Sequence, residues 1–449
     1  MAKARFSHIG FILAAAGAAV GLGNIWKFPY ITGMYGGGAF VAIYLITVIL
    51  IGFSLLGAEM LIGHKGGKDA VSSFEIVAPE GKKGWKYAGF MLFSGMVIMT
   101  FYSVVIGWIF HYIYLSFSNQ LPTNMAEAKD TFDALVGNAP LLSIFWHFSA
   151  TVFVGVVLLG GIKAGIEKAN LILMPLLLVI LIGLMGYAMS FDGFGKALAF
   201  MFEPDWSKIN SEAIVRAVGH AFFTLSIGIG TMVTYAASMS HKQSVFKAAM
   251  WVTVLDTLIA LVAGVMIYSF IFEYGAAPGQ GPGLVFKTLP IVLTQLGTTG
   301  LVIAVVFFCA LAFAGLTSAI SLTEPAVEYF IQRFHWSRKK SVIFNSSLYF
   351  VVGIGAILSY TKAYGEMFSI AGKPLFDVLE FSTDSILLPI GGLLIALFVG
   401  YVLPQKEREH IVKHQVNHTV YKVWLFSLKY IAPLAIIFMM LNNFGIIKI

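Results

Sequence analysis

Residues 17–29 read GAAVGLGNIWKFP, and they lie inside an apolar run long enough to cross a membrane. The glycines at 17, 21 and 23 favour an interruption here, because glycine weakens the interior of a helix. Backbone carbonyls freed inside a bilayer persist only where they line a cavity or bind a cation. Asn24 adds a neutral side-chain oxygen beside them. The stretch therefore predicts a broken membrane helix with a binding site at its break.

The composition places the rest of the chain in the membrane as well. Of 449 residues, 58% are hydrophobic and only 11% are charged, whereas roughly 25% of a soluble chain is charged. So few charges exclude a soluble enzyme, a nucleic-acid binder and a disordered scaffold. The single cysteine, Cys309, lies in an apolar run and excludes a disulfide framework.

Apolar stretches that can cross a bilayer recur along the whole chain. Eleven are found, at about 9–33, 39–62, 88–117, 143–162, 168–190, 213–238, 245–272, 298–330, 341–359, 376–403 and 419–446. They predict an all-α polytopic protein with a single transmembrane domain, residues 1–449. The long connection at 273–297 is expected to dip back over the outer face as a lid.

The basic residues predict the orientation of these spans. With the amino terminus in the cytoplasm, nineteen of the 29 Lys and Arg residues fall in inner segments and eight in outer segments. This bias follows the positive-inside rule. We expect a multi-pass protein of the cell membrane with its amino terminus inside and, after eleven spans, its carboxyl terminus outside.

A second glycine-interrupted span suggests an internal repeat. Gly-Leu-Gly at 21–23 has a counterpart in Gly-Ile-Gly at 228–230, five helices later and so in the opposite orientation. Such a pair indicates the binding site of an inverted-repeat transporter. The repeats would be 9–190 and 213–403, with 419–446 as an extra helix. Packing notches for neighbouring helices are the alternative explanation of the glycines.

Several motifs in order resemble one family. Beyond 17–29 they are GGGAF at 36–40, GHAFFTLSIGIG at 219–230, FAGLTSAI at 313–320 and LLP at 387–389. Together they resemble the neurotransmitter:sodium symporters, in particular the bacterial amino-acid transporters of that family. The resemblance extends through at least ten helices. It implies an inverted five-plus-five repeat with helices one and six broken.

The same resemblance implies two sodium ions as coupling ions and no other cofactor. Sodium is a hard cation that prefers oxygen ligands. The first site would use the carbonyl of Ala19, the side chains of Asn24, Thr224 and Asp256, and the carboxylate of the substrate. The second would use the carbonyls of Gly17, Val20 and Ala314 and the hydroxyls of Thr317 and Ser318. Bonds from these hydroxyls back to their own helix are the alternative reading.

Asp256 lies in the middle of a span, where an unpaired carboxylate costs several kcal/mol. Relatives carry a second charge or chloride one turn later, where this chain has Ala260. We therefore expect Asp256 to supply the fixed negative charge of a chloride-independent transporter, and hypothesise that it takes up a proton on the return step. A structural polar cluster with His220 and Tyr44 is compatible with this role.

By resemblance, the substrate site has no charged side chain and therefore favours a neutral, hydrophobic or aromatic L-amino acid. Amides at the break in helix one would face the substrate's carboxylate. The expected residues are Ala19, Gly21, Leu22, Gly23, Ile98, Tyr102, Phe223, Thr224, Ser226, Ile229, Ser318 and Leu322. On their own, Phe223 and Ile229 would more simply be packing residues.

The resemblance also suggests gates on either side of the site. Lys27 and Glu380 would close the outer side, although Lys27 alone could extend to the membrane interface. The family's inner pair aligns with Ala2 and Gln332, so we assign no inner gate. We interpret Glu59 and Glu324 as structural acids bonded to broken backbone.

Sodium-coupled symport of an amino acid by alternating access is thus the preferred function, with the amino acid, sodium and the bilayer as partners and no nucleic acid. Nothing in the sequence points to a particular oligomeric state. A non-transporting amino-acid sensor is the first alternative, but no cytoplasmic output domain is evident. An intramembrane enzyme using Asp256, Glu59 and His220 is the second, but no nucleophile has a neighbouring base.

Overall fold

The computed structural model describes residues 5–240, 242–275, 283–412 and 415–447, and these are helical almost throughout. Helices satisfy their own backbone hydrogen bonds, which a segment inside a bilayer must do. A short hairpin, β1 (Ser369–Ile370) and β2 (Lys373–Pro374), is the one sheet in this part of the chain. Ala2 and residues 276–282 of the expected outer lid lie outside the described residues.

Nine helical spans in the described residues are long and apolar enough to cross a membrane. Five are built largely from one long helix: α6 (Leu92–Phe117) preceded by η3 (Lys83–Met91), α8 (Pro140–Leu159), α13 (Val245–Glu273), α15 (Gly297–Phe334) and α16 (Arg338–Leu358). Four contain a short π-helical segment: α3 (Gly38–Thr47), η2 (Val48–Gly52) and α4 (Phe53–Gly66); η5 (Ile162–Glu167) and α9 (Lys168–Ala188); α17 (Leu375–Ser382), η8 (Thr383–Leu387), α18 (Leu388–Leu397) and η9 (Phe398–Val402); α20 (His418–Phe426), η10 (Ser427–Ile431) and α21 (Ala432–Asn443).

Two further spans are broken. The first runs through α1 (His8–Ala19), η1 (Gly23–Lys27) and α2 (Phe28–Met34), and its halves are bent by 46°. The other consists of α11 (Ser211–Thr224) and α12 (Thr231–Ala236), separated by a six-residue break. Together with the nine continuous spans they give the eleven spans that the sequence predicts, with helices one and six broken.

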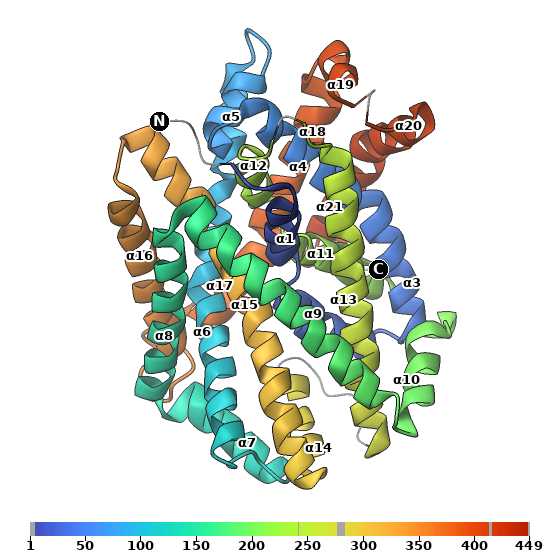
Figure 1. The fold of residues 1–449 in the computed structure, drawn as a ribbon, viewed down its shortest axis with the longest axis vertical. Helices are drawn as coiled ribbons and strands as arrows, with labels where there is room; N and C mark the ends of the chain where they lie inside the picture. The colour runs from blue at the N-terminus through green and yellow to red at the C-terminus, as the bar shows by residue number, and fades with distance from the viewer. Residues whose placement is uncertain (1–4, 241, 276–282, 413–414, 448–449) are drawn as a thin grey trace.

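Shorter elements connect the spans. They are α5 (Ala70–Val77), α7 (Met125–Asp133), η4 (Ala134–Asn138), α10 (Gly193–Phe202), η6 (Trp206–Lys208), η7 (Leu284–Thr288), α14 (Leu289–Thr294) and α19 (Gln405–Val412). Figure 1 shows α5 and α19 at the end of the molecule where the chain begins, here called the N-terminal face, and α7 and α14 at the opposite face. The described part of the outer connection packs on the bundle there, because Tyr112 Oη donates to the carbonyl of Phe286 at 2.7 Å.

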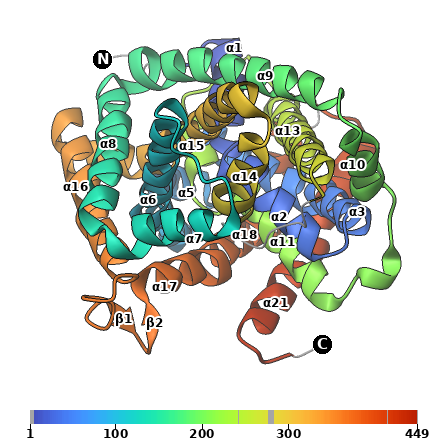
Figure 2. The ribbon, with the colours of Figure 1, turned by 90° about the horizontal axis from the view of Figure 1, so that it is seen from below.

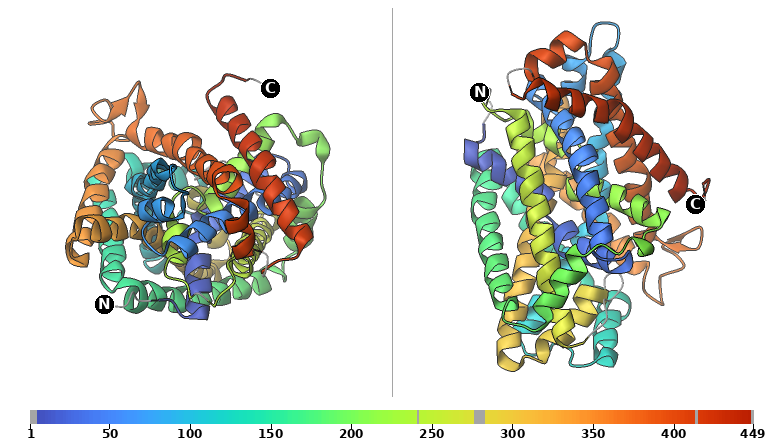
Figure 3. Two further views of the ribbon diagram at one scale, coloured as in Figure 1. Left: turned by 90° about the horizontal axis from the view of Figure 1, so that it is seen from above. Right: turned by 90° about the vertical axis from the view of Figure 1, so that its right-hand side faces the viewer.

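The broken helices lie inside the bundle. Seen from the opposite face, α2, α11 and α18 are near the centre, while α8, α9 and α16 form part of the outer wall (Figure 2). The last helix, α21, runs along the outside (Figure 3). Accordingly, α9 exposes Ile172, Leu176, Val179 and Ile182 on its outer side, and the two breaks are enclosed by protein.

Candidate ion and solute site

The break in helix one follows from its glycines and is held by side chains. The last intact turn of α1 closes with a 2.6 Å bond from the Val20 amide to the Ala16 carbonyl. The next amides find other acceptors: Gly21 N donates to Asn24 Oδ1 at 2.9 Å, and Leu22 N donates to Tyr102 Oη at 3.3 Å. The carbonyls at the end of α1 are thereby released from the helix.

The break in helix six has a left-handed backbone. Gly228 and Gly230 have φ values of 80° and 79°, which glycine adopts readily. Ser226 has φ 52°, unusual for a residue with a side chain. Its hydroxyl donates to the Ala18 carbonyl at 2.7 Å, and Glu59 Oε2 accepts from Gly228 N at 3.3 Å. The first of these bonds joins the two breaks, and the second places Glu59 of α4 on broken backbone, as the sequence suggested.

A small cavity of about 20 Å³ lies between the breaks. It is lined by Ala18, Ala19, Gly21, Gly23, Ile98, Tyr102, Phe223, Thr224, Ser226, Ile229, Ser318 and Leu322. Eleven of these are the residues expected from the sequence. Ala18 was not expected, and Leu22 instead lines a larger outer cavity. A volume of this size holds about one water molecule, so an amino acid fits only when the lining side chains move apart.

The residues expected at the first sodium site form one buried network. Asp256 is completely buried on α13, and its Oδ1 accepts from Asn24 Nδ2 at 2.7 Å and from Thr224 Oγ1 at 2.9 Å. Asn24 Nδ2 also donates to the Asp256 backbone carbonyl at 2.9 Å. Ala19 lies beside Thr224 in the cavity wall. The network thus brings a carboxylate, a hydroxyl and an amide together from three spans.

The residues expected at the second sodium site also lie together. Ser318 Oγ on α15 is 3.2 Å from the carbonyl oxygens of both Gly17 and Val20. Thr317 Oγ1 lies 3.0 Å from the Ala314 carbonyl oxygen and 3.0 Å from that of Phe313, so its proton bonds back within the helix. Its lone pairs remain available to a cation. Carbonyl and hydroxyl oxygens of α1 and α15 therefore face one another, and none of these groups is charged.

The outer cavity has a volume of about 440 Å³ and extends from Tyr102 and Phe223 past Lys27 to Glu380. The sequence predicts that Lys27 pairs with Glu380, but in the structure the Lys27 ammonium pairs with Asp384. The ammonium also lies 4.3 Å from the centre of the Phe223 ring. Asp384 follows Glu380 by four residues, so both acids lie on one helical face. The ammonium reaches the second of them.

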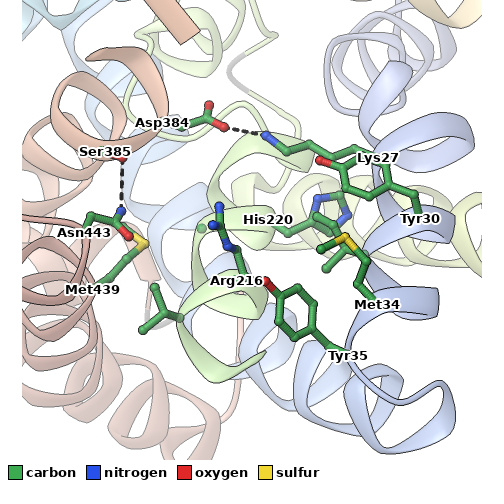
Figure 4. A pocket seen from close by; sticks show the side chains of 13 residues that line it. Lys27, Tyr30, Met34, Tyr35, Arg216, His220, Asp384, Ser385, Met439 and Asn443 are labelled. Atoms are coloured by element: carbon green, nitrogen blue, oxygen red, sulfur yellow. Dashed lines mark hydrogen bonds and ion pairs between the residues drawn. The ribbon is translucent and has the colours of Figure 1, made fainter. Parts of the chain in front are cut away.

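Figure 4 shows this pair at the edge of another cavity, of about 380 Å³, between α2, α11, η8 and α21. Tyr30 and Met34 project from α2, and His220 projects from α11 toward them. The Tyr44 ring lies 5.3 Å from that of His220. The Tyr44 hydroxyl interacts with Asp256, which also hydrogen-bonds to Asn24 and Thr224, so Tyr44 connects His220 to the acid network.

Contacts at the N-terminal face close that side, where the sequence gave no gate. Ser7 caps α1, and both its amide and its hydroxyl donate to Glu167 Oε1 on η5. Phe6 is buried, and its amide donates to the Ser238 carbonyl at 3.2 Å. Glu167 is buried, but it lies beside Lys168 between two predicted spans, so nothing in the sequence indicated that it closes this side.

The interpretation of Glu324 as a partner of broken backbone also needs correction. Its carboxylate forms two bonds with the Arg338 guanidinium, at 3.1 and 2.6 Å. Arg338 begins α16, and its Nε donates to the Leu158 carbonyl. Through Arg338, Glu324 therefore ties α15 to α8 and α16.

Comparison with known proteins shows similarity over nearly the whole chain. The model of the Sodium:neurotransmitter symporter family matches residues 4–138 and 141–448. The uncharacterized sodium-dependent transporter YhdH of Bacillus subtilis (strain 168) is 33% identical over 446 residues, 98% of each chain. The sodium-dependent nutrient amino acid transporter 1 of Drosophila mojavensis is 25% identical, covering 77% of this chain and 63% of that protein.

The fold is also similar to a solved structure, that of MhsT in complex with L-phenylalanine. The TM-score is 0.89 and the sequences are 39% identical, and the match covers 98% of this chain and 100% of the other. The match therefore includes the segments that form both broken helices and the walls of the small cavity in this chain.

Proposed function

The chain belongs to the sodium:neurotransmitter symporter family, and we propose that it carries a neutral, hydrophobic or aromatic L-amino acid into the cell together with sodium by alternating access. It is a multi-pass membrane protein and a sodium-dependent transporter, not an enzyme. The network of Asn24, Thr224 and Asp256 at the edge of the small cavity carries the proposal, because it places cation ligands beside a cavity that lies between the two broken helices.

The substrate's carboxylate completes the first sodium site in this proposal. Members of the family that transport amines have an aspartate where this chain has Gly21. In this chain the carboxylate of the substrate would therefore take the position of that aspartate side chain. A side chain at Gly21 would require neighbouring hydroxyls to move, since its Cβ would lie 2.5 Å from Ser318 Oγ and 3.0 Å from Tyr102 Oη. The sodium ion and the carboxylate then stabilise each other in a site of low dielectric.

The remaining walls select the side chain of the substrate. Ile98, Ile229 and Leu322 are buried and apolar, and the lining residues include no Lys, Arg, Asp or Glu. Phe223 lines both this cavity and the outer one, so its movement would join them. The complex of MhsT with L-phenylalanine supports an amino acid of this class.

We assign the second sodium ion to the carbonyls of Gly17, Val20 and Ala314 with the hydroxyls of Thr317 and Ser318. These oxygens are neutral, which suits a single positive charge inside the membrane. The ion would connect α1 to α15. Since α1 ends at this point, we propose that occupation of the second site holds the inner half of helix one in place.

Asp256 supplies the fixed negative charge of the proposed mechanism. The next turn of α13 carries Ala260, which is buried, so no second acid lies there. A permanent carboxylate beside the first sodium ion makes an external anion unnecessary. We therefore propose that transport is independent of chloride.

We propose that residues 9–190 and 213–403 form the two inverted repeats, with the span within 419–446 added outside them. The distribution of basic residues supports a cytoplasmic amino terminus and an outer carboxyl terminus in the cell membrane. On this orientation the outer cavity opens to the exterior, and the contact between Ser7 and Glu167 closes the cytoplasmic side.

Uptake into proteoliposomes tests this function. An inward sodium gradient should raise accumulation of labelled L-phenylalanine or L-leucine about tenfold over a potassium gradient, within the usual range of coupling between ligands. L-Glutamate and L-lysine should accumulate far less, and replacing chloride with gluconate should leave uptake unchanged. Equal uptake in potassium, or preference for a charged amino acid, would contradict the proposal.

A further inference from the structure

Asn170 on α9 is a buried polar residue that neither the predicted sodium sites nor the gates include. Its side chain is 1% exposed. Its Nδ2 donates to the carbonyl of Ile166, one turn earlier, at 2.9 Å. Its Oδ1 has no hydrogen-bond partner among the described residues. A buried amide oxygen left unpaired is costly and calls for a ligand that completes it.

The oxygen of Asn170 faces helix one at Gly17. A Cβ added to Gly17 would collide with Asn170 Oδ1 and would lie 3.2 Å from Thr317 Cβ. The amide oxygen therefore sits where α1, α9 and α15 meet. Gly17 and Thr317 are two of the residues assigned to the second sodium ion, so the unpaired oxygen lies at the edge of that site.

We propose that Asn170 supplies an additional oxygen to the second sodium site and sets its affinity. An amide oxygen is a hard, neutral donor of the kind that Asn24 offers in the first site, and it adds no charge to the membrane interior. The missing side chain at Gly17 allows α9 to approach. This inference rests on the proposed function, because it presupposes a sodium ion between α1 and α15.

Asn345 offers a matched control. It is also fully buried, its Nδ2 donates to the carbonyl of Ser341, four residues earlier, at 2.7 Å, and its Oδ1 has no partner in the described part of the chain. It lies on α16, which packs on α6, α8 and α15 but, within the described residues, is not among the helices that pack against α1. Replacing Asn345 removes a buried amide and its hydrogen bond to the preceding turn, as replacing Asn170 does, but leaves the contacts of helix one unchanged.

The experiment measures sodium binding without relying on transport. The sodium concentration for half-maximal thermal stabilisation, and for half-maximal binding of radioactive sodium, is determined for the purified wild type, Asn170→Leu, Asn170→Asp and Asn345→Leu. Asn170→Leu should raise this sodium concentration about tenfold, as expected for loss of one oxygen ligand. Asn170→Asp, which keeps the oxygen, should not raise it. Asn345→Leu should stay within about twofold of the wild type.

Each outcome is decisive. A folded Asn170→Leu protein with unchanged sodium dependence, or an equal shift in Asn345→Leu, would overturn the assignment of Asn170 while leaving the proposed transport intact. A wild type that sodium does not stabilise would overturn both. If Asn170→Leu does not fold, Asn170→Ala is measured in the same way, with the same expected rise.

Discussion

Replacing Asp256 with asparagine is expected to lower sodium-driven uptake at least about 100-fold. The carboxylate is completely buried and accepts hydrogen bonds from Asn24 and Thr224, so asparagine keeps the shape of the network but removes the negative charge that faces the ion. Breaking a buried charge pair costs roughly 3–5 kcal/mol, and each 1.4 kcal/mol is a factor of ten. The measurement is initial uptake as a function of sodium concentration.

Glu324→Gln is the matched control for this variant. Glu324 is another fully buried acid inside a span, but its partner is Arg338. The Glu324→Gln variant should keep the sodium concentration for half-maximal uptake within about twofold of the wild-type value, even where the substitution lowers the amount of folded protein. If Asp256→Asn retains the wild-type sodium dependence, Asp256 is not a ligand of the coupling ion. If the wild type already requires chloride, the fixed-charge role is wrong.

Asp384→Asn is expected to slow uptake about tenfold, whereas Glu380→Gln should change it less than about twofold. The Lys27 ammonium pairs with Asp384, and the two side chains are only 17% and 28% exposed. A hydrogen bond between charged groups that is partly shielded from water contributes roughly 1.5–3 kcal/mol. Without it the outer passage should close less completely over a bound substrate.

The release of pre-bound labelled amino acid to the outside reports this closure. Asp384→Asn should release the substrate about ten times faster, and the exchanged pair Lys27→Asp with Asp384→Lys should recover part of the loss. Glu380→Gln serves as the control on the same helical face. A larger effect in Glu380→Gln than in Asp384→Asn would restore the pairing that the sequence suggested.

The fold was predictable because its signals are local. Eleven apolar stretches and two glycine pairs, at 21–23 and 228–230, are enough to place the spans and both breaks. The walls of the small cavity were expected mainly through resemblance. Leu22 is the exception: at a broken helix end the side-chain direction no longer follows the 3.6-residue period, and this side chain turns to the outer cavity.

The contacts of long side chains were less predictable. Glu380 and Asp384 lie one turn apart on the same face, so the sequence alone does not decide which of them Lys27 reaches. The bonds of Ser7 to Glu167 and the approach of Asn170 to Gly17 depend on how α9 packs against α1. These contacts join residues more than 150 positions apart, where no periodic pattern gives the register.

The central claim is that sodium and the substrate's carboxylate share one site, and paired binding measurements test it most directly. The affinity of purified protein for L-phenylalanine and for L-phenylalaninamide is measured in sodium and in potassium. We predict that L-phenylalanine binds in sodium and loses at least about tenfold in potassium, that the amide binds in neither, and that L-phenylalanine raises sodium affinity by the same factor. Equal affinity in both ions, or tight binding of the amide, would contradict the account.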